Sequence, residues 1–491
     1  MISADRDNVP HHTRRAIRFI AVLCVILYVN WVFMVARFQT NVMFWDQWQF
    51  YLPLFQEQGW WARAMQQNGP HREGLGFVVS GWILGATQWD VRYDSVWTAS
   101  VLLLAAGLAV RLKWKMTGAI SFLDAWIPLM CLTPGQFETI LAVPHVSHSV
   151  LPFALMLLAA NVWLSSSPAL QYLGTAAIAV VLTFTGFGLF AAGVIAILLV
   201  AGAGGHALVG DRRRVCLAAA GTALCAAGWA LFMQDYVFQP SVENFRFPWT
   251  PWTDYARFIA LMLNLSTGEI GQWLPPYLLG GMLTLIVISS AVSILWLWLK
   301  NRRSPRHDVL VLLMGSGLIF VAVTAIGRVS LGPVAGTAPR YLSLLIPMWL
   351  AIHLAAAISA RRPMAVAATV CVWVLAASSY VTVFGRSPVE WPGTIGLTRA
   401  DLNSVLHYGT NKAAWVEVYV ATGRWEAAQT ALRDFLHPNP IGSNFDDKFH
   451  FLRERRLSFF AGEPERGDYM PWLADENFRR LVADQKKSTP R

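Results

Sequence analysis

The sequence is poor in charged residues, which make up 14% of its 491 positions. Soluble domains carry roughly a quarter charged residues, so this content excludes an ordinary soluble enzyme and a disordered chain. Cysteine is also scarce, and the five cysteines form no CxxC pair and no metal-ligand spacing, which excludes a disulfide scaffold and a zinc site. No GxSxG, HExxH or P-loop motif occurs, so hydrolase, zinc-protease and nucleotide-driven pump functions lack support.

Apolar residues are abundant: 55% of the chain is hydrophobic, the mean hydropathy is +0.43, and there are 23 tryptophans. The charges are unevenly spread, because 29 of the 68 lie in residues 386–491 and only 39 in the first 385 positions. This division predicts a transmembrane domain over 1–385 and a soluble domain over 386–491.

Apolar runs long enough to cross a bilayer, roughly 20 residues each, predict an all-α, polytopic helical bundle of about eleven spans. The run at 171–204 is too long for one span, and Gly186-Phe187-Gly188 divides it into two. The first run follows a basic N-terminus and has no small-residue cleavage site, so it is expected to be retained. The other spans are expected at 16–36, 94–111, 120–141, 148–164, 215–233, 276–299, 308–327, 340–359 and 363–384.

Basic clusters indicate the orientation, since Lys and Arg concentrate in cytoplasmic loops. With eleven spans, the clusters at 14–18, 111–115, 212–214, 300–306 and 361–362 all fall on one side. The sequence therefore predicts a multi-pass protein of the bacterial inner (plasma) membrane, with a cytoplasmic N-terminus and a periplasmic (extracytoplasmic) C-terminal domain. The net charge of +10 is then a topology signal, and no nucleic-acid partner is expected.

The charge-free segment 74–89 is short for a span and is expected to be an interfacial or re-entrant helix; a full crossing is the alternative. It ends a first outer loop over 37–93, and a second outer loop covers 234–275. In the C-terminal domain, helical periodicity predicts a hairpin over 415–435 and a charged helix over 445–458.

The first outer loop holds the strongest candidates for chemistry. Asp46 directly follows the first span, and a carboxylate at the outer interface can accept the proton of a sugar hydroxyl that attacks an anomeric carbon. Trp45 and Trp48 can stack on a sugar face or contact a lipid headgroup. The plainer interpretation is that Asp46 caps a helix and that the tryptophans belong to an aromatic belt.

His71, Arg72 and Glu73 place a titratable base, a permanent cation and a carboxylate beside the apolar segment 74–89. Three functions are open to this cluster: binding a divalent cation such as Mg²⁺ or Mn²⁺ together with Asp46, orienting an acceptor, or forming an internal Arg–Glu pair.

Arg328 and the pair Arg340-Tyr341 flank a loop rich in glycine and proline. Guanidinium groups at the outer interface suit a lipid phosphate, which they bind bidentately, although arginines at helix ends also snorkel to the interface. Weaker candidates follow from PGQFETILAVPHVSH and STGEIGQW: Gln136, Glu138, His145, His148 and Glu269.

The ordered motifs WDQW, NGPHREG, QFET, GR…PRY and HPNPIGSNFDDKFHFLRERRLSFF resemble those of a bacterial multi-pass membrane family of largely unassigned function. An acid after the first span, a large first outer loop and an outward C-terminal domain resemble the GT-C superfamily of polyprenyl-phosphate-dependent glycosyltransferases. The chain departs from the family's WDDW and NEHR patterns at Gln47 and at Gly69-Pro70. The departure at Gln47 weakens the expectation of a metal site built from paired aspartates.

The resemblance implies inverting transfer of a sugar from a polyprenyl-phosphate donor to a glycan, lipid or cell-envelope acceptor, at the outer face of the membrane. Asp46 would be the general base, Arg340 would hold the leaving phosphate, and Glu73 would assist through a metal or the acceptor. Two other functions are weighed against it: a transporter or flippase of a lipid-linked glycan, and a non-catalytic membrane scaffold.

Overall fold

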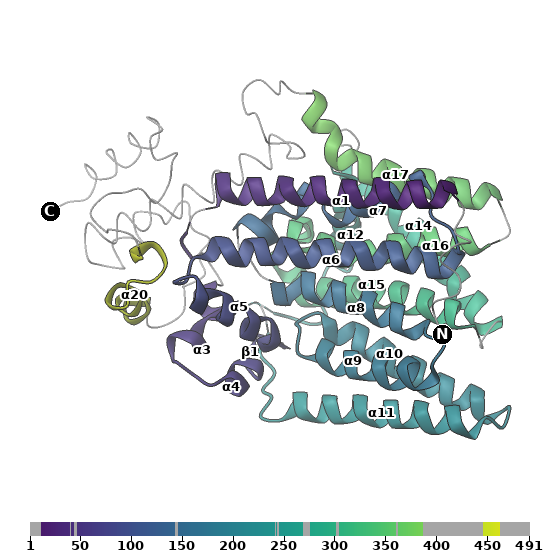
Figure 1. Cartoon of the computed structure of the whole chain (residues 1–491), viewed down its shortest axis with the longest axis horizontal. Helices are drawn as coiled ribbons and strands as arrows, with labels where there is room; N and C mark the ends of the chain where they lie inside the picture. The colour runs from purple at the N-terminus through teal and green to yellow at the C-terminus, as the bar shows by residue number, and fades with distance from the viewer. Residues whose placement is uncertain are drawn as a thin grey trace.

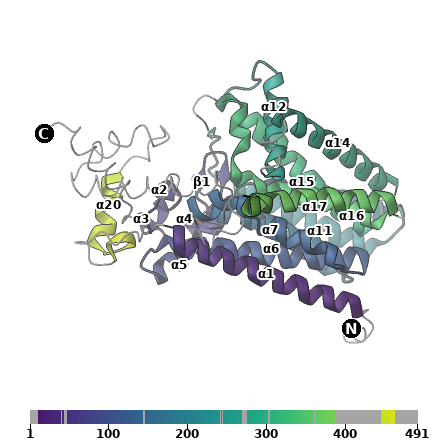
Figure 2. The ribbon, with the colours of Figure 1, turned by 90° about the horizontal axis from the view of Figure 1, so that it is seen from above.

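The computed structural model describes residues 11–39, 41–43, 47–142, 146–240, 242, 245–268, 275–300, 304–359, 362–385 and 445–461. Within them, eight helical segments are long and apolar enough to cross a membrane, and they pack side by side in one bundle (Figure 1; Figure 2). They contain α1 (His11–Phe38), α6 (Val91–Thr117), α8 (Leu151–Trp163) after the π turn η5 (Val146–Val150), α10 (Gly188–Ala207), α11 (Arg212–Met233), α14 (Pro276–Lys300), α15 (Pro305–Arg328) and α16 (Leu342–Ile358) after η10 (Pro339–Tyr341).

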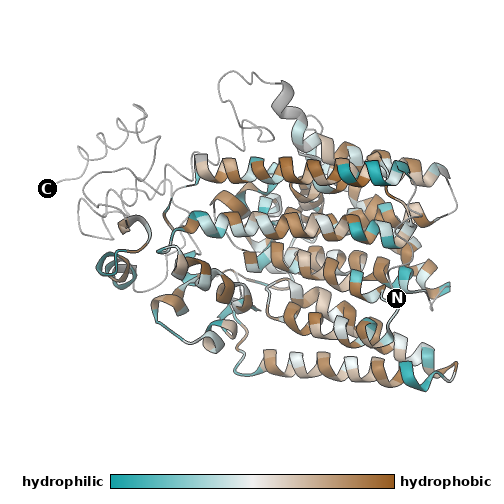
Figure 3. Cartoon of the chain, in the orientation of Figure 1, coloured by the Kyte–Doolittle hydropathy of each residue, from teal (hydrophilic) through white to brown (hydrophobic). Residues whose placement is uncertain are grey.

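The bundle is apolar both inside and outside. Along α1, for example, Val22, Val25 and Val29 are more than half exposed on one helix face, while Trp31 is fully buried. In Figure 3, hydrophobic residues, coloured brown, recur along the other long helices as well. Apolar side chains exposed over whole helices require a lipid surrounding. The prediction of an all-α polytopic membrane protein is therefore confirmed at this level.

Three shorter apolar helical segments accompany the long ones: α5 (Gly74–Ala86), α9 (Thr175–Thr183) after the π turn η6 (Leu170–Gly174), and the apolar part of α17 (Arg362–Gly385). The expected division of 171–204 is confirmed, because the chain breaks between α9 and α10 at Gly186, whose φ is +52°. With 13 residues, α5 is about 20 Å long and cannot cross a hydrocarbon core of about 30 Å.

The expected continuous span over 120–141 is wrong in detail. The chain there forms η2 (Phe122–Ala125), α7 (Trp126–Cys131), η3 (Pro134–Gln136) and the π turn η4 (Glu138–Ala142). Pro134 follows the end of α7, and a proline offers no N–H to continue a helix. The break leaves Gln136 and Glu138 in short turns rather than in a regular helix.

The first outer loop is a compact unit at one end of the bundle, together with the C-terminal helix α20 (Figure 1; Figure 2). We call this the loop end. The unit contains α2 (Gln47–Phe50), α3 (Leu52–Phe55), α4 (Trp60–Ala64), α5, and a hairpin of β1 (Gln67–Asn68) and β2 (His71–Arg72). The two-residue strands pair antiparallel, with Gln67 opposite Arg72 and Asn68 opposite His71, a feature that an all-α prediction lacks.

In the second outer loop, α12 (Thr253–Asn264) and η7 (Leu265–Thr267) follow the segment with the two Pro-Trp steps. Between α15 and α16 lie η8 (Val329–Leu331) and η9 (Pro333–Thr337). Gly336 of η9 packs so closely on α12 that an added Cβ would lie 2.6 Å from the carbonyl oxygen of Phe258.

In the C-terminal part, the structure describes α20 (Phe445–Glu454) and η11 (Ser458–Phe460), so the expected helix over 445–458 is confirmed over most of its length. The predicted hairpin over 415–435 lies outside the described residues. The Phe451 ring of α20 lies 5.5 Å from the rings of both Phe55 and Trp89, and the Ser458 N–H donates to the Gln88 carbonyl at 2.7 Å. The C-terminal segment is thus attached to the first outer loop.

Candidate functional site

The β1–β2 hairpin and the start of α5 position His71, Arg72 and Glu73. Gly69 takes the turn of the hairpin with φ +55°, a conformation that glycine adopts at little cost. Glu73 is the residue before α5, and Gly74 lets the helix begin against α4, because a Cβ there would lie 1.9 Å from the Arg63 carbonyl oxygen. This close approach fixes where the Glu73 side chain starts.

Glu73 pairs with a histidine from a distant part of the chain. Its carboxylate, on a residue only 1% exposed, lies 2.8 Å from Nδ1 of His148 in η5. Next to it, the Ser147 hydroxyl donates to the Glu73 carbonyl at 2.5 Å and accepts from the Gly76 N–H at 3.2 Å. The start of α5 and the π turn η5 are therefore joined by side-chain and main-chain bonds together.

The break between α9 and α10 closes the other side of this pair. The Gly186 N–H donates to the Arg72 carbonyl at 3.1 Å. An added Cβ at Gly186 would lie 3.3 Å from Cα of His148 and 3.5 Å from Oε1 of Glu73. The neighbouring Phe187 ring lies 4.3 Å from the His148 ring and 4.9 Å from the His71 ring.

His71 is the second histidine of the cluster, with its ring 6.0 Å from that of His148. Burial lowers the pKa of His71 to about 4; the charges of His148 and Arg328 act in the same direction, and that of Glu73 acts against them. His71 is therefore neutral at pH 7. Its buried Nδ1 has no hydrogen-bond partner among the described residues.

Arg72, expected to contact a substrate or to pair with Glu73, instead binds main chain. Its guanidinium donates to the carbonyl oxygen of Phe232 at 2.8 Å and also to those of Met65 and Gln234. The residue is only 4% exposed. These bonds fasten the hairpin to the end of α11, so the structure gives Arg72 a positioning role.

Arg340 and Glu138 join the two motifs PRY and QFET. The Arg340 guanidinium lies 2.5 Å from Oε1 of Glu138, and the Arg340 N–H donates to Oε2 at 3.3 Å. Beside them, the Ser343 hydroxyl is hydrogen-bonded to the Gln136 side chain. Glu138 is 5% exposed, whereas the Arg340 side chain is 30% exposed, so the cation is the accessible member of this pair.

A row of aromatic rings connects the Glu73–His148 pair to Arg340. From Phe187 it passes to Phe320 at 4.9 Å and to Tyr341 at 5.9 Å, and the Arg340 guanidinium lies 5.6 Å from the Tyr341 ring. Tyr341 is 1% exposed, and its hydroxyl has no hydrogen-bond partner among the described residues. A buried polar atom without a partner is costly and is commonly satisfied by water or a ligand.

Arg328 is the last residue of α15 and lies close enough to His71 for its charge to act on the imidazole. Its side chain is partly exposed, and the described residues offer it no hydrogen bond or ion pair. Of the two arginines predicted to bind phosphate, Arg328 is therefore the one without a protein carboxylate partner in the described part of the chain.

Of the predicted residues around the first span, Trp45 and Asp46 lie outside the described residues, as do His145 and Glu269. Trp48 is 1% exposed and stacks on Phe55 at 6.0 Å, so it is a buried side chain of the first loop rather than an open sugar platform.

A further buried carboxylate, which was not predicted from the sequence, lies next to this loop: Asp94, in the first turn of α6. It accepts hydrogen bonds from the hydroxyls of Tyr51 and, at 2.8 Å, of Ser80. Burial, together with the charge of Asp94, raises the pKa of Tyr51 well above its ordinary value, so that the phenol stays protonated. Tyr51 also hydrogen-bonds Gln47, the residue that follows Asp46.

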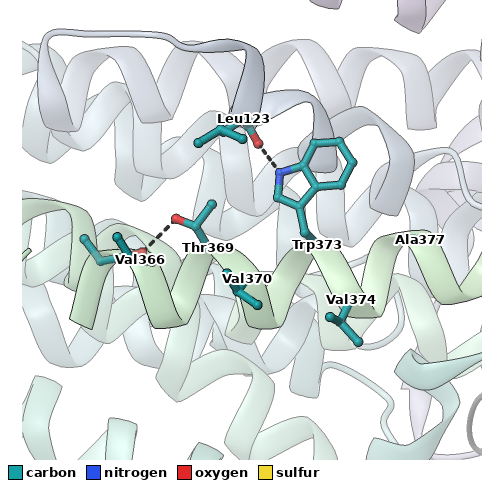
Figure 4. Close-up of a pocket in the computed structure, with 8 residues that line it drawn as sticks. Leu123, Val366, Thr369, Val370, Trp373, Val374 and Ala377 are labelled. Atoms are coloured by element: carbon teal, nitrogen blue, oxygen red, sulfur yellow. Dashed lines mark hydrogen bonds between the residues drawn. The ribbon is translucent and has the colours of Figure 1, made fainter. Parts of the chain in front are cut away.

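Among the described residues, no three His, Cys, Asp or Glu side chains lie close enough together to hold a metal ion. An apolar groove of about 520 Å³ lies elsewhere, between α17 and η2 (Figure 4). Trp373 crosses it and donates to the Leu123 carbonyl at 2.6 Å, and Val366, Val370 and Val374 line it. With no charged side chain in its lining, this groove suits lipid chains rather than chemistry.

Comparison of the chain with protein-family models, with curated proteins and with solved structures finds no match.

Proposed function

We propose that the protein is a membrane glycosyltransferase that transfers a sugar, with inversion, from a polyprenyl-phosphate donor to a glycan, lipid or cell-envelope acceptor at the outer face of the bacterial inner membrane. The observation that carries the proposal is the cluster around Phe187 and Tyr341. There, a histidine–glutamate pair, a neutral histidine and two arginines meet at one end of an apolar bundle.

The chemistry of the cluster suits a lipid-linked phosphate. Arg328 and Arg340 supply cations, and guanidinium groups bind phosphate oxygens bidentately without losing their charge. The apolar faces of the bundle provide the surroundings that a polyprenyl chain requires. The two unpartnered polar atoms, Nδ1 of His71 and the Tyr341 hydroxyl, are available to hydroxyl or phosphate oxygens of a substrate.

In the proposed reaction, an acceptor hydroxyl attacks the anomeric carbon as the bond to the phosphate oxygen breaks. Asp46 accepts the hydroxyl proton, and the arginines stabilise the charge that develops on the leaving phosphate. Glu73 is bonded to His148 in the structure, so we assign it to the site through that histidine and derive no step from a divalent cation.

The proposal includes a topology of eleven crossings, of the type found in the GT-C superfamily. In addition to the eight long segments, the chain would cross through 120–141, through η6 with α9, and through α17. The loop end and the C-terminal domain would then be periplasmic, and the basic clusters with the N-terminus cytoplasmic.

The experiment that tests the proposal measures binding of undecaprenyl phosphate to the purified protein, followed by sugar transfer from the corresponding lipid-phosphate sugars. We expect saturable binding that weakens at least tenfold in Arg328→Ala and persists in Asp46→Asn. Transfer by Asp46→Asn should fall at least 100-fold, in the range of general-base contributions.

Two results would contradict the proposal. If neither the wild type nor any variant binds the lipid phosphate, the scaffold function becomes the better one. If the wild type binds and moves the lipid across a membrane while Asp46→Asn keeps full function, the protein is a transporter.

A further inference from the structure

The groove between α17 and η2 takes no part in the proposed reaction. Its lining follows α17 from Ala365 to Ala377, a distance of about 18 Å at the rise of an α-helix. One leaflet of a bilayer has a hydrocarbon depth of about 15 Å, half of a core of about 30 Å. The groove is therefore long enough to hold one hydrocarbon chain across one leaflet.

The side chains that line the groove offer a ligand no free hydrogen-bond donor. The Thr369 hydroxyl donates to the Ala365 carbonyl at 2.7 Å, and the Trp373 indole N–H donates to the Leu123 carbonyl at 2.6 Å (Figure 4). The other side chains of the lining are apolar. A polar ligand would lose its hydrogen bonds to water here, whereas a hydrocarbon chain has none to lose. The lining therefore suits an apolar chain.

The groove lies in the half of the bundle away from the loop end. Along α1, which leads into the first outer loop, the Phe19 ring lies 5.5 Å from the Phe122 ring of η2. Trp31, nearer to that loop, instead donates to the Leu132 carbonyl at 2.9 Å. The turn η2, which forms one wall of the groove, therefore packs against the half of α1 that is farther from the loop end.

Two arginines of α1 lie on the face of the helix that carries Phe19. Arg15 precedes Arg18 by three residues and Phe19 by four, and these spacings place the three side chains next to one another. Both arginines are exposed, and neither has a hydrogen-bond or ion-pair partner among the described residues. Because helical side chains lean toward the helix N-terminus, both guanidinium groups reach away from the loop end, where lipid headgroups lie.

The carboxylate of η2 does not compensate these two charges. Asp124 is 2% exposed and lies 3.5 Å from the Lys113 ammonium and 3.4 Å from the His353 imidazole. It also accepts the Ser121 N–H at 2.7 Å. Since Asp124 is buried and paired, the two arginines remain available to an anion at the surface beside the groove.

We propose that the groove binds one acyl chain of an anionic phospholipid whose phosphate is held by Arg15 and Arg18, in the leaflet opposite the loop end. The second chain lies on the rings of Phe19 and Phe122, which are 48% and 52% exposed. Basic side chains next to membrane helices attract anionic headgroups, and guanidinium groups bind phosphate oxygens bidentately. The site shares no residue with the cluster at the loop end, so the proposal is independent of sugar transfer.

A matched pair of valines tests the chain-binding part of the site. Val370 lines the groove and is 55% exposed, and Val292 on α14 is 63% exposed. Val370→Trp fills the groove, whereas Val292→Trp adds the same side chain to another apolar helix surface.

A matched pair of double variants tests the headgroup part. Arg15→Gln/Arg18→Gln removes the two cations beside the groove. Arg212→Gln/Arg213→Gln removes two exposed cations at the start of α11. All the substituted side chains are exposed, so the fold should tolerate each of the four variants.

The test titrates the purified protein in detergent with dioleoyl phosphatidylglycerol or dioleoyl phosphatidylcholine and follows bound lipid by native mass spectrometry. The two lipids have the same chains, but only the first has a net negative charge. The wild type should bind a single phosphatidylglycerol roughly tenfold more tightly than phosphatidylcholine, and Arg15→Gln/Arg18→Gln should lose this preference. Val370→Trp should weaken binding of both lipids about fivefold. Both control variants should bind as the wild type does.

Three results would overturn the proposal. The first is equal affinity of the wild type for the two lipids, or wild-type binding by both Val370→Trp and Arg15→Gln/Arg18→Gln. The second is displacement of phosphatidylglycerol by undecaprenyl phosphate at equal concentration, which would assign the groove to the polyprenyl lipid. The third is a wild-type dimer that Val370→Trp dissociates, which would show that a second copy covers the groove. Failure of the sugar-transfer proposal would leave all of these measurements unchanged.

Discussion

At the scale of single residues, the guanidinium of Arg340 would have two competing partners, the Glu138 carboxylate and a lipid phosphate. The buried Glu138 carboxylate needs Arg340, since an uncompensated buried charge is costly. A lipid phosphate would need the same guanidinium. Because Glu138 contacts one Nη and the main-chain N–H, it holds Arg340 in place and leaves part of the guanidinium exposed. Arg328 lacks such a partner among the described residues.

This difference predicts that substitution of the two arginines changes different properties of the protein: mainly its stability for Arg340, and mainly phosphate binding for Arg328. Arg340→Ala should reduce the free energy of unfolding by about 2 kcal/mol, less than for a fully buried pair because the Arg340 side chain is 30% exposed. Arg328→Ala should leave stability within about 0.5 kcal/mol and mainly weaken phosphate binding. Thermal unfolding in detergent and lipid-binding titration measure the two effects. If the double variant Arg340→Ala/Glu138→Gln regains stability, the uncompensated charge of Glu138 is the cause of the loss. Equal destabilisation by Arg340→Ala and Arg328→Ala would contradict the prediction.

The lowered pKa of the buried His71 predicts that the stability of the protein depends on pH. Burial lowers its pKa to about 4, below about 6.5 in the unfolded chain. The unfolded chain therefore takes up the proton first, so this contribution is complete above pH 6.5 and is lost as the pH falls toward 4. Between pH 6.5 and pH 5 the loss should be on the order of 1 kcal/mol. Unfolding curves of the wild type and His71→Gln measure it, and identical slopes against pH would refute it.

The residues of the cluster were only partly predictable. Glu73, His71, Arg328 and Arg340 were expected from their chemistry near the outer interface, and His148 and Glu138 were weaker candidates. Their pairing was not predicted, because His148 lies 75 positions from Glu73 and Glu138 lies 202 positions from Arg340, so no local spacing marks either pair. The buried bonds of Asp94 were not predicted, because nothing near it in the sequence points to Tyr51.

At the scale of elements, the loop end depends on places where main chains approach more closely than side chains allow. The start of α5 against α4 is the clearest case, because the nearest atoms to a Cβ on Gly74 belong to the main chain of Arg63 and Ala64 and cannot rotate away. The same helix contains Gly85, where an added Cβ would meet no atom within 4 Å.

These two glycines form a matched pair for a test of the element. Gly74→Ala should displace α5 and the hairpin, lower stability by about 2 kcal/mol or more, and weaken lipid-phosphate binding by moving Glu73. Gly85→Ala should be neutral or stabilise by up to about 1 kcal/mol, since alanine favours a helix. Unfolding and binding titrations of both variants measure this. A Gly74→Ala protein that matches Gly85→Ala in both would show that the close packing is dispensable.

Hydropathy predicted the elements well where an apolar run is one helix and poorly where it is not. The break at Gly186 was visible because the run was too long for one span and carried two glycines. The interruption of 120–141 was missed because its length fits one span. Hydropathy does not register that Pro134 offers no N–H to a helix or that Glu138, at the start of a π turn, pairs with Arg340.

At the scale of the whole molecule, the C-terminal segment is part of the loop end. Beyond the contacts of Phe451, Arg455 forms an ion pair with Glu57 and lies 4.5 Å from the Phe451 ring. The cluster of His71, Glu73 and His148 belongs to the same compact end (Figure 1). The proposed chemistry would therefore occur on the side of the membrane where α20 lies.

The sidedness of Arg213 and Arg455 distinguishes two topologies. If only the eight long segments cross, four crossings (α11, α14, α15 and α16) separate these residues, and both lie on one side. If the chain crosses eleven times, α17 adds a fifth, and they lie on opposite sides. In a variant whose five cysteines are replaced, we expect Arg455→Cys to react with a membrane-impermeant maleimide in intact spheroplasts, and Arg213→Cys only after permeabilisation. Labelling of both residues in intact spheroplasts, or of neither before permeabilisation, would rule out the eleven-crossing topology, since Arg213 would then share the side of the C-terminal domain.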